Sequence, residues 1–194
     1  MENNESLSPV DSLKFIESMI HKAQNRFSEN GTLYLIWGWT IFLCSLVQYF
    51  SVKFTSFSNA SLIWLLVVFV MIYQIFYLSK KRKTDKVTTY SDEIIGYVWM
   101  TFGICMGLLT IIMSKLHIWI LFYPFIFLFY GIPTFLSGAI MRFKPLMFGG
   151  ICCWLLSIAA SFITSIEVIL LLVPAVLFGW IIPAYLLRAR FKSA

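Results

Sequence analysis

The chain has 194 residues, of which 60% are hydrophobic and only 12% are charged, and its formal net charge is +6 at pH 7. A soluble globular domain is about 45–50% apolar and about 25% charged, so this composition excludes an ordinary soluble fold for most of the chain. Six apolar stretches of about 20 residues leave no room for a separate soluble domain. We therefore expect one membrane domain with an N-terminal appendage.

Residues 8–29 have the pattern of an amphipathic helix, with apolar side chains at helical spacing from Leu13 to Phe27. Because this helix directly precedes the first apolar stretch, we expect it to lie along the cytoplasmic membrane surface. Docking of a protein partner at the cytoplasmic face is the alternative. We assign residues 1–30 to a cytoplasmic amphipathic segment and residues 31–194 to a six-span membrane domain.

The six apolar stretches are each long enough to cross a bilayer core, which needs roughly 20 apolar residues per helix. They cover residues 32–51, 60–79, 94–114, 117–140, 146–164 and 167–187. This pattern predicts an all-α fold, a polytopic bundle of six transmembrane helices built from helical hairpins. Aromatic residues close to the ends of the stretches, among them Tyr34, Trp37 and Trp64, are interpreted as anchors at the membrane interfaces.

Positive charge is distributed unevenly along the chain, which indicates its orientation. If the N-terminus is cytoplasmic, the inner segments hold thirteen basic residues and the outer loops hold two. The inner ones are Lys14, Lys22, Arg26, Lys80, Lys81, Arg82, Lys83, Lys86, Arg142, Lys144, Arg188, Arg190 and Lys192, and the outer ones are Lys53 and Lys115. This asymmetry predicts a multi-pass protein with cytoplasmic N- and C-termini. The basic residues then contact the anionic headgroups of the lipid bilayer, which argues against nucleic-acid binding.

A run of four basic residues closes the second stretch. It consists of Lys80, Lys81, Arg82 and Lys83. Its ordinary role is to stop translocation and to anchor the helix on the positive side. A direct contact with anionic lipid headgroups is the functional interpretation.

The second half of the chain repeats itself. Residues 94–144 and 146–192 resemble two copies of one helical hairpin, and each copy has two prolines nine residues apart followed by an Arg-Phe-Lys sequence. The prolines are Pro124 and Pro133 in the first copy and Pro174 and Pro183 in the second. Broken helices at corresponding positions of repeated halves point to a binding site. Curvature that serves bundle packing is the alternative.

Glycines in these stretches are candidate packing or hinge positions. Gly131 and Gly179 lie close to the second proline of each pair, and Gly103 with Gly107 forms a Gly-x-x-x-Gly motif in the third stretch. Such spacing lets helices approach closely, either within the protein or between copies in a homo-oligomer. We expect packing within the protein, because six helices already supply many interfaces.

The sequence contains no arrangement of residues that is typical of an enzyme. No ionisable residue lies deep in a stretch, and neither a His-Glu-x-x-His, a Gly-x-Ser-x-Gly nor a phosphate-binding glycine loop occurs. The cysteines, which are Cys44, Cys105, Cys152 and Cys153, lie in apolar stretches without CxxC spacing and are interpreted as packing residues. We therefore expect no enzyme, no catalytic residue, no cofactor and no metal site.

Several short pieces spread over most of the chain carry a resemblance. They are Glu17-Ser18-Met19-Ile20, Ser28-Glu29-Asn30-Gly31, Trp37-Gly38-Trp39, Tyr130-Gly131-Ile132, Ser137-Gly138, Phe143-Lys144-Pro145-Leu146, Gly149-Gly150-Ile151 and Ile182-Pro183-Ala184-Tyr185-Leu186-Leu187. With them the chain resembles a family of small six-helix bacterial integral membrane proteins without an established activity. The resemblance implies a bacterial inner membrane and supplies no catalytic or binding residues. This chain has Pro124 and Pro133 where the resemblance leads us to expect one proline.

Two functions follow as hypotheses from these observations. The leading one is a non-enzymatic regulatory or scaffold subunit that acts through interactions, since buried charge and catalytic groups are lacking and an amphipathic helix is available at the cytoplasmic face. The alternative is a small transporter or channel for a neutral or lipid-like solute, which the paired-proline helices suggest.

Overall fold

A computed structural model describes residues 31–55, 60–84 and 90–192. All regular elements in these ranges are helical. Six stretches are long and apolar enough to cross a membrane, namely Gly31–Phe54, Leu62–Lys80, Glu93–Leu116, Phe122–Ile140, Lys144–Ser161 and Ile166–Ala189. The predicted all-α bundle of six membrane-spanning helices is thus confirmed. The amphipathic helix expected over residues 8–29 lies outside the described residues.

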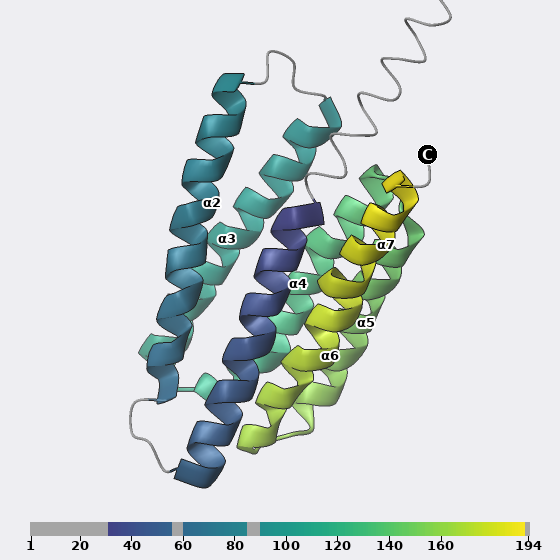
Figure 1. Cartoon of the computed structure of the whole chain (residues 1–194). Coiled ribbons are helices and arrows are strands. Elements are labelled where there is room, and N and C mark those ends of the chain that lie inside the picture. The colour runs from purple at the N-terminus through teal and green to yellow at the C-terminus, as the bar shows by residue number, and fades with distance from the viewer. Residues whose placement is uncertain (1–30, 56–59, 85–89, 193–194) are drawn as a thin grey trace, which may run out of the picture.

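The elements follow one another as antiparallel spans (Figure 1). The first span is a helix over residues 31–50 that continues as the π-helix η1 (Ser51–Thr55). The next three spans are η2 (Ala60–Trp64) with α2 (Leu65–Thr84), α3 (Tyr90–Leu116), and η3 (Trp119–Leu121) with α4 (Phe122–Ile140). The fifth span is α5 (Lys144–Ser161), and the sixth is divided into η4 (Ile166–Leu171), α6 (Leu172–Val176), η5 (Leu177–Ile181) and α7 (Ile182–Lys192).

One end of the bundle carries most of the described positive charge, and we call it the basic end. Lys80 and Arg188 lie near the C-terminal ends of α2 and α7, and Arg142 and Lys144 lie between the end of α4 and the start of α5; these helix ends are at the top of Figure 1. The guanidinium of Arg188 donates a hydrogen bond to the Thr32 hydroxyl at 2.8 Å, which ties the sixth span to the first. At the opposite end Lys53 lies 4.0 Å from the Glu167 carboxylate and joins the same two spans.

A tight turn at the basic end makes α4 and α5 antiparallel neighbours. Arg142 adopts a positive φ of 50°, the N–H of Phe143 donates to the Gly138 carbonyl at 2.8 Å, and the N–H of Arg142 donates to the Ala139 carbonyl at 3.1 Å. This pair of bonds is a Schellman motif, which satisfies the last carbonyls of a helix. The buried ring of Phe143 then packs beside Leu146, so the chain reverses directly into α5.

Glycines allow α4 and α5 to pack with their backbones in close approach. A Cβ on Gly150 would lie 2.7 Å from the Phe135 Cβ, and one on Gly138 would lie 2.7 Å from the Met147 nitrogen. A Cβ on Gly131 would overlap the indole of Trp154. Larger residues at these three positions would therefore push the two helices apart.

Two indole–amide hydrogen bonds hold α2 against the first span. The Trp37 indole N–H donates to the Gln74 amide oxygen at 2.5 Å, and the Trp64 indole N–H donates to the amide oxygen of Gln48. The two pairs lie near opposite ends of the hairpin and fix its antiparallel register. The indoles of Trp37 and Trp64 are thus bonded within the bundle, and their role as interface anchors stays a prediction.

The core lies around the sixth span, whereas α2 lies at the edge of the bundle (Figure 1). Half of the most apolar window of the sixth span is buried, compared with 11% of the window in α3 and none of the window in α2. Side chains of the sixth span that are fully buried include Val168, Ile169 and Val176. The sixth span therefore forms the centre of the core.

Candidate functional site

The α-helical hydrogen-bond pattern of the sixth span is interrupted between its two prolines, although the span stays one continuous helix. Pro174 lies in the short helix α6, Pro183 is the second residue of α7, and the π-helix η5 separates them. In η5 the N–H of Ile182 donates to the carbonyl of Leu177, five residues earlier. Pro183 has no N–H to continue the ordinary ladder, and single π-turns inside α-helices are frequent at functional sites.

The first proline pair has a different effect. Pro133 lies inside α4, which runs without interruption over Phe122–Ile140, and Pro124 falls in the first turn of that helix, where a missing N–H is tolerated. The preceding helices also differ, since α3 has 27 residues and α5 has 18. Each proline-bearing span does begin with a 3-10 helix, η3 or η4. The hairpin repeat over 94–144 and 146–192 stays a prediction.

On the inner side of the broken span, aromatic rings gather around Trp180. The ring centroid of Trp180 lies 4.5 Å from that of Tyr130, 5.6 Å from that of Trp99, and 6.2 Å from those of Tyr34 and Trp37. We call these five residues the Trp180 cluster. It joins the first span, α3, α4 and η5, so four of the six spans meet at one side chain.

Two buried polar atoms in this region have no hydrogen-bond partner within the described part of the chain, the Tyr130 hydroxyl and the Trp180 indole nitrogen. The Ser137 hydroxyl is also buried and has Tyr34 within hydrogen-bonding reach. Thr134 donates to the Tyr130 carbonyl at 2.8 Å. The ring centroids of Tyr130 and Trp180 lie 4.5 Å apart, so the two unpaired groups belong to neighbouring side chains. Neutral donors and acceptors in an apolar interior can bind a small polar molecule, because an unsatisfied group there is costly.

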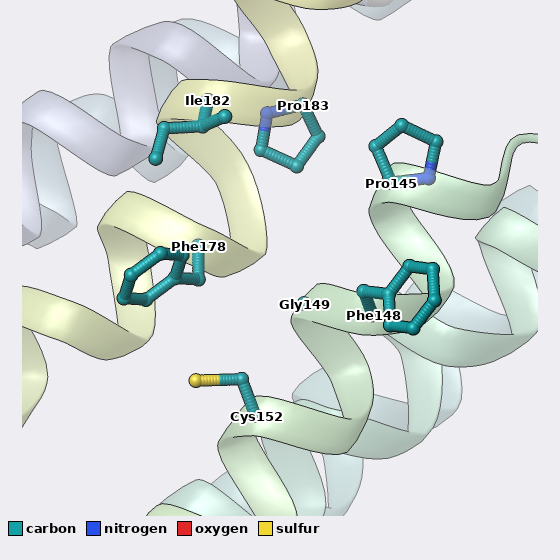
Figure 2. A pocket seen from close by; sticks show the side chains of 7 residues that line it. All are labelled: Pro145, Phe148, Gly149, Cys152, Phe178, Ile182 and Pro183. Atoms are coloured by element: carbon teal, nitrogen blue, oxygen red, sulfur yellow. The ribbon is translucent and has the colours of Figure 1, made fainter.

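On the outer side of the broken span a groove runs between α5 and the η5–α7 segment. Its volume is about 280 Å³. Figure 2 shows Pro145 on α5 opposite Pro183, the rings of Phe148 and Phe178 on the two sides of the groove and directed away from each other, and the Cys152 side chain at the end away from Pro145. We call this the α5–α7 groove. All seven side chains around it are apolar or a thiol, so it suits hydrocarbon.

The floor of the groove is a backbone contact. A Cβ on Gly149 would lie 2.5 Å from the Phe178 carbonyl oxygen and 2.7 Å from the Gly179 Cα. Gly179 itself would meet only ordinary contacts, such as 3.6 Å to a ring carbon of Tyr130. Gly131 lies where a Cβ would overlap Trp154, and Gly179 lies between the floor of the groove and the Trp180 cluster. The close approach at Gly149 was not predicted from the sequence.

The two glycines of the Gly-x-x-x-Gly motif contact no other helix among the described residues. A Cβ on Gly103 or Gly107, and equally on Gly96, would find no atom within 4 Å in that part of the chain. The expectation of internal packing at Gly103 and Gly107 therefore stays a prediction. The rotation of α3 turns Ile95, Leu109 and other apolar side chains inward instead.

Small residues continue along this outer side of α3. Thr110 and Ser114 are exposed like the glycines, and spacings of seven, four, three and four residues place all five small side chains on one helix face. We call Gly96, Gly103, Gly107, Thr110 and Ser114 the glycine face of α3. The buried face with Ile95, Trp99, Phe102, Leu109 and Met113 lies about a quarter turn away.

The basic run at the end of α2 is described only in part. The helix continues through Lys80, Lys81, Arg82 and Lys83 to Thr84, and of these side chains only that of Lys80 lies within the described set, where it is exposed. The predicted lipid contact of the run stays a prediction. Among the described residues no three His, Cys, Asp or Glu side chains gather as a metal site.

The fold and these sites define a class, a multi-pass helical membrane protein with a compact core and an exposed α2–α3 pair. The chain matches no protein-family model, and neither a curated protein nor a solved structure is similar to it.

Proposed function

We propose that the protein is a non-enzymatic interaction subunit of a membrane complex and that the glycine face of α3 binds a transmembrane helix of a partner protein. The observation that carries this proposal is the open space at Gly96, Gly103 and Gly107. Helix–helix contacts in membranes are enriched in small residues at four-residue spacing because the backbones can then approach closely.

Glycine is a poor choice for a helix face that meets only lipid. Each glycine inside a helix is less favourable than alanine by roughly 0.5–1 kcal/mol. Within the described part of the chain no helix packs on the three glycines of this face, whereas Gly131, Gly138 and Gly150 each admit a neighbouring helix. A partner helix at the glycine face would provide the missing compensation.

Photo-crosslinking in native membranes tests this proposal. A photoreactive side chain at Met100, which flanks the glycine face, should crosslink to a transmembrane segment of one partner chain, and the double substitution Gly103→Leu/Gly107→Leu should abolish the product. The matched control is the same probe at Ile112, which is also exposed but lies on another face of α3.

Equal crosslinking from Met100 and Ile112, or a product that survives the glycine substitutions, would contradict the proposal. A product formed with a second copy of this chain would replace the partner helix by a homodimer contact. Native mass spectrometry of the gently extracted complex then gives the stoichiometry.

We further propose that the protein resides in a bacterial inner membrane with both termini in the cytoplasm. The positive-inside distribution of basic residues supports this orientation. The N-terminal segment would then be a second contact for a partner at the cytoplasmic face. Deleting residues 1–29 should weaken partner association without preventing membrane insertion. Labelling of a single introduced cysteine after residue 192 by a membrane-impermeant reagent, in intact and in opened cells, tests the sidedness.

A second candidate function is transport of a neutral or lipid-like solute. The specific observation in its favour is the broken sixth span, which has unpaired polar groups on one side and an apolar groove on the other. The substitution Pro183→Ala should then change flux across reconstituted vesicles. Native protein that moves no tested solute would remove this candidate.

A further inference from the structure

One end of the α5–α7 groove lies next to a cation. Pro145, which lines this end, directly follows the exposed Lys144. Arg188, five residues beyond Pro183 on the facing wall, is directed toward Thr32 of the first span. The groove is therefore apolar along its length, with the ammonium of Lys144 next to its end at Pro145.

We propose that the α5–α7 groove binds one acyl chain of an anionic glycerophospholipid, with the phosphate beside Lys144. The lipid comes from the bilayer leaflet on the basic side. Charge complementarity selects this occupant, because the exposed ammonium of Lys144 stands at the level where α5 begins and where headgroups lie. The positive end of the α5 dipole, whose first turn has no side-chain cap, adds to the attraction.

The dimensions fit a section of one chain rather than a bulky solute. Pro145 and Cys152 are seven residues apart on α5, which corresponds to about 10 Å along the helix axis, and one leaflet contributes about half of a 30 Å hydrocarbon core. The groove volume of about 280 Å³ falls just below the roughly 300–1,000 Å³ of pockets that enclose a drug-sized ligand. The acyl chain would lie lengthwise with its glycerol end at Pro145.

The two walls of the α5–α7 groove are held at a fixed distance. The backbone contact at Gly149 fixes the distance between α5 and η5, while the rings of Phe148 and Phe178 stand out on either side and are 70% and 52% exposed. A methylene chain between the two rings would contact both walls. A convex lipid-facing helix offers a chain only one wall, so this groove should retain lipid longer than the rest of the surface.

Native mass spectrometry of the purified full chain tests the proposal, with phosphatidylglycerol and phosphatidylcholine of identical chains as probes. Wild-type protein should retain one phosphatidylglycerol and prefer it about fivefold over phosphatidylcholine, the contribution of one lysine near an anionic headgroup. Lys144→Gln should remove the preference, and Cys152→Phe, which fills the groove, should lower retention of both lipids at least tenfold. The matched controls, Lys115→Gln at the other end and Leu155→Phe farther along α5, should behave as wild type.

Equal retention of the two lipids by wild type, or full retention by Cys152→Phe, would overturn the proposal. A second measurement needs no substitution that could disturb folding. Phosphatidylglycerol with a diazirine in its acyl chain should label wild-type protein mainly at the peptides around Phe148 and Phe178, and excess unlabelled phosphatidylglycerol should suppress this labelling. Labelling that is as strong on the exposed face of α2 would also overturn the proposal.

Discussion

The second and the sixth spans are equally apolar, yet they occupy opposite environments. None of the most apolar window of α2 is buried, whereas half of the corresponding window of the sixth span is. The difference lies in the small residues: α2 contains neither glycine nor alanine, while the sixth span contains Ala175, Gly179 and Ala184, all of them buried. In lipid, apolar character makes a helix span the membrane, and small side chains decide whether another helix can pack against it.

α3 is the exception to this comparison, and the exception bears on function. It carries glycines like the core helices, but they face away from the core. Either small residues on α3 do not serve helix packing, or its glycines are matched to a helix of another molecule.

The largest effect is expected for a valine at a core glycine. Gly149→Val should lower the free energy of unfolding by about 3 kcal/mol or more, at the upper end of overpacking costs, because the added atoms meet the backbone of Phe178 and Gly179. Gly103→Val, which meets open space, is the matched control and should leave stability unchanged or slightly higher. Unfolding in mixed micelles with increasing sodium dodecyl sulfate measures both, and similar losses would contradict the comparison.

The next largest difference in stability is expected when a phenylalanine is truncated in the core and on α2. Phe127 is 1% exposed and Phe76 is 72% exposed. Phe127→Ala should destabilise the protein by about 3 kcal/mol, at the lower end of the range for such truncations, because lipid lacks the driving force that water adds. Phe76→Ala should stay within about 0.5 kcal/mol of wild type. The same micelle titration checks the pair, and a Phe76→Ala loss as large as that of Phe127→Ala would assign α2 to the core.

The sequence predicted the spans closely because a membrane-crossing helix must be long and apolar. The third stretch, expected at 94–114, is found as Glu93–Leu116. The fourth was expected to begin at residue 117 and begins at Phe122, because His117 adopts a positive φ of 54° and a 3-10 turn intervenes. The hydropathy pattern does not predict local backbone conformations of this kind.

Packing partners were less predictable, because they depend on helix rotation. The indole partners of Gln48 and Gln74 depend on the register of the first hairpin, which hydropathy does not give. The prolines marked the sixth span as a candidate broken helix, but the same spacing in α4 left an uninterrupted helix. The groove and the Trp180 cluster arise from contacts between distant segments, so composition alone could not reveal them.

The indole–amide pair tests what holds α2 at the edge. Gln74→Leu should lower the free energy of unfolding by about 0.6–1.7 kcal/mol, the range measured for hydrogen bonds between membrane helices. A double-mutant cycle with Trp37→Phe isolates the pair, because the second substitution should add little once the first has removed the bond. Fully additive losses in the micelle titration would show that the 2.5 Å contact contributes no coupling.

The smallest predicted effect on stability separates partner binding from folding at the glycine face of α3. Gly103→Ala adds one methyl group where no atom lies within 4 Å, so the isolated protein should become more stable by roughly 0.5–1 kcal/mol, the helix preference for alanine over glycine. The same methyl group would separate α3 from a helix packed against it, and crosslinking from Met100 should fall. Improved stability together with lost crosslinking is expected only if the glycines serve a second molecule. Gly131→Ala is the matched contrast, since it should lose stability through its overlap with Trp154. If Gly103→Ala left crosslinking intact while stabilising the chain, the glycine face would have no partner and α3 would simply face lipid.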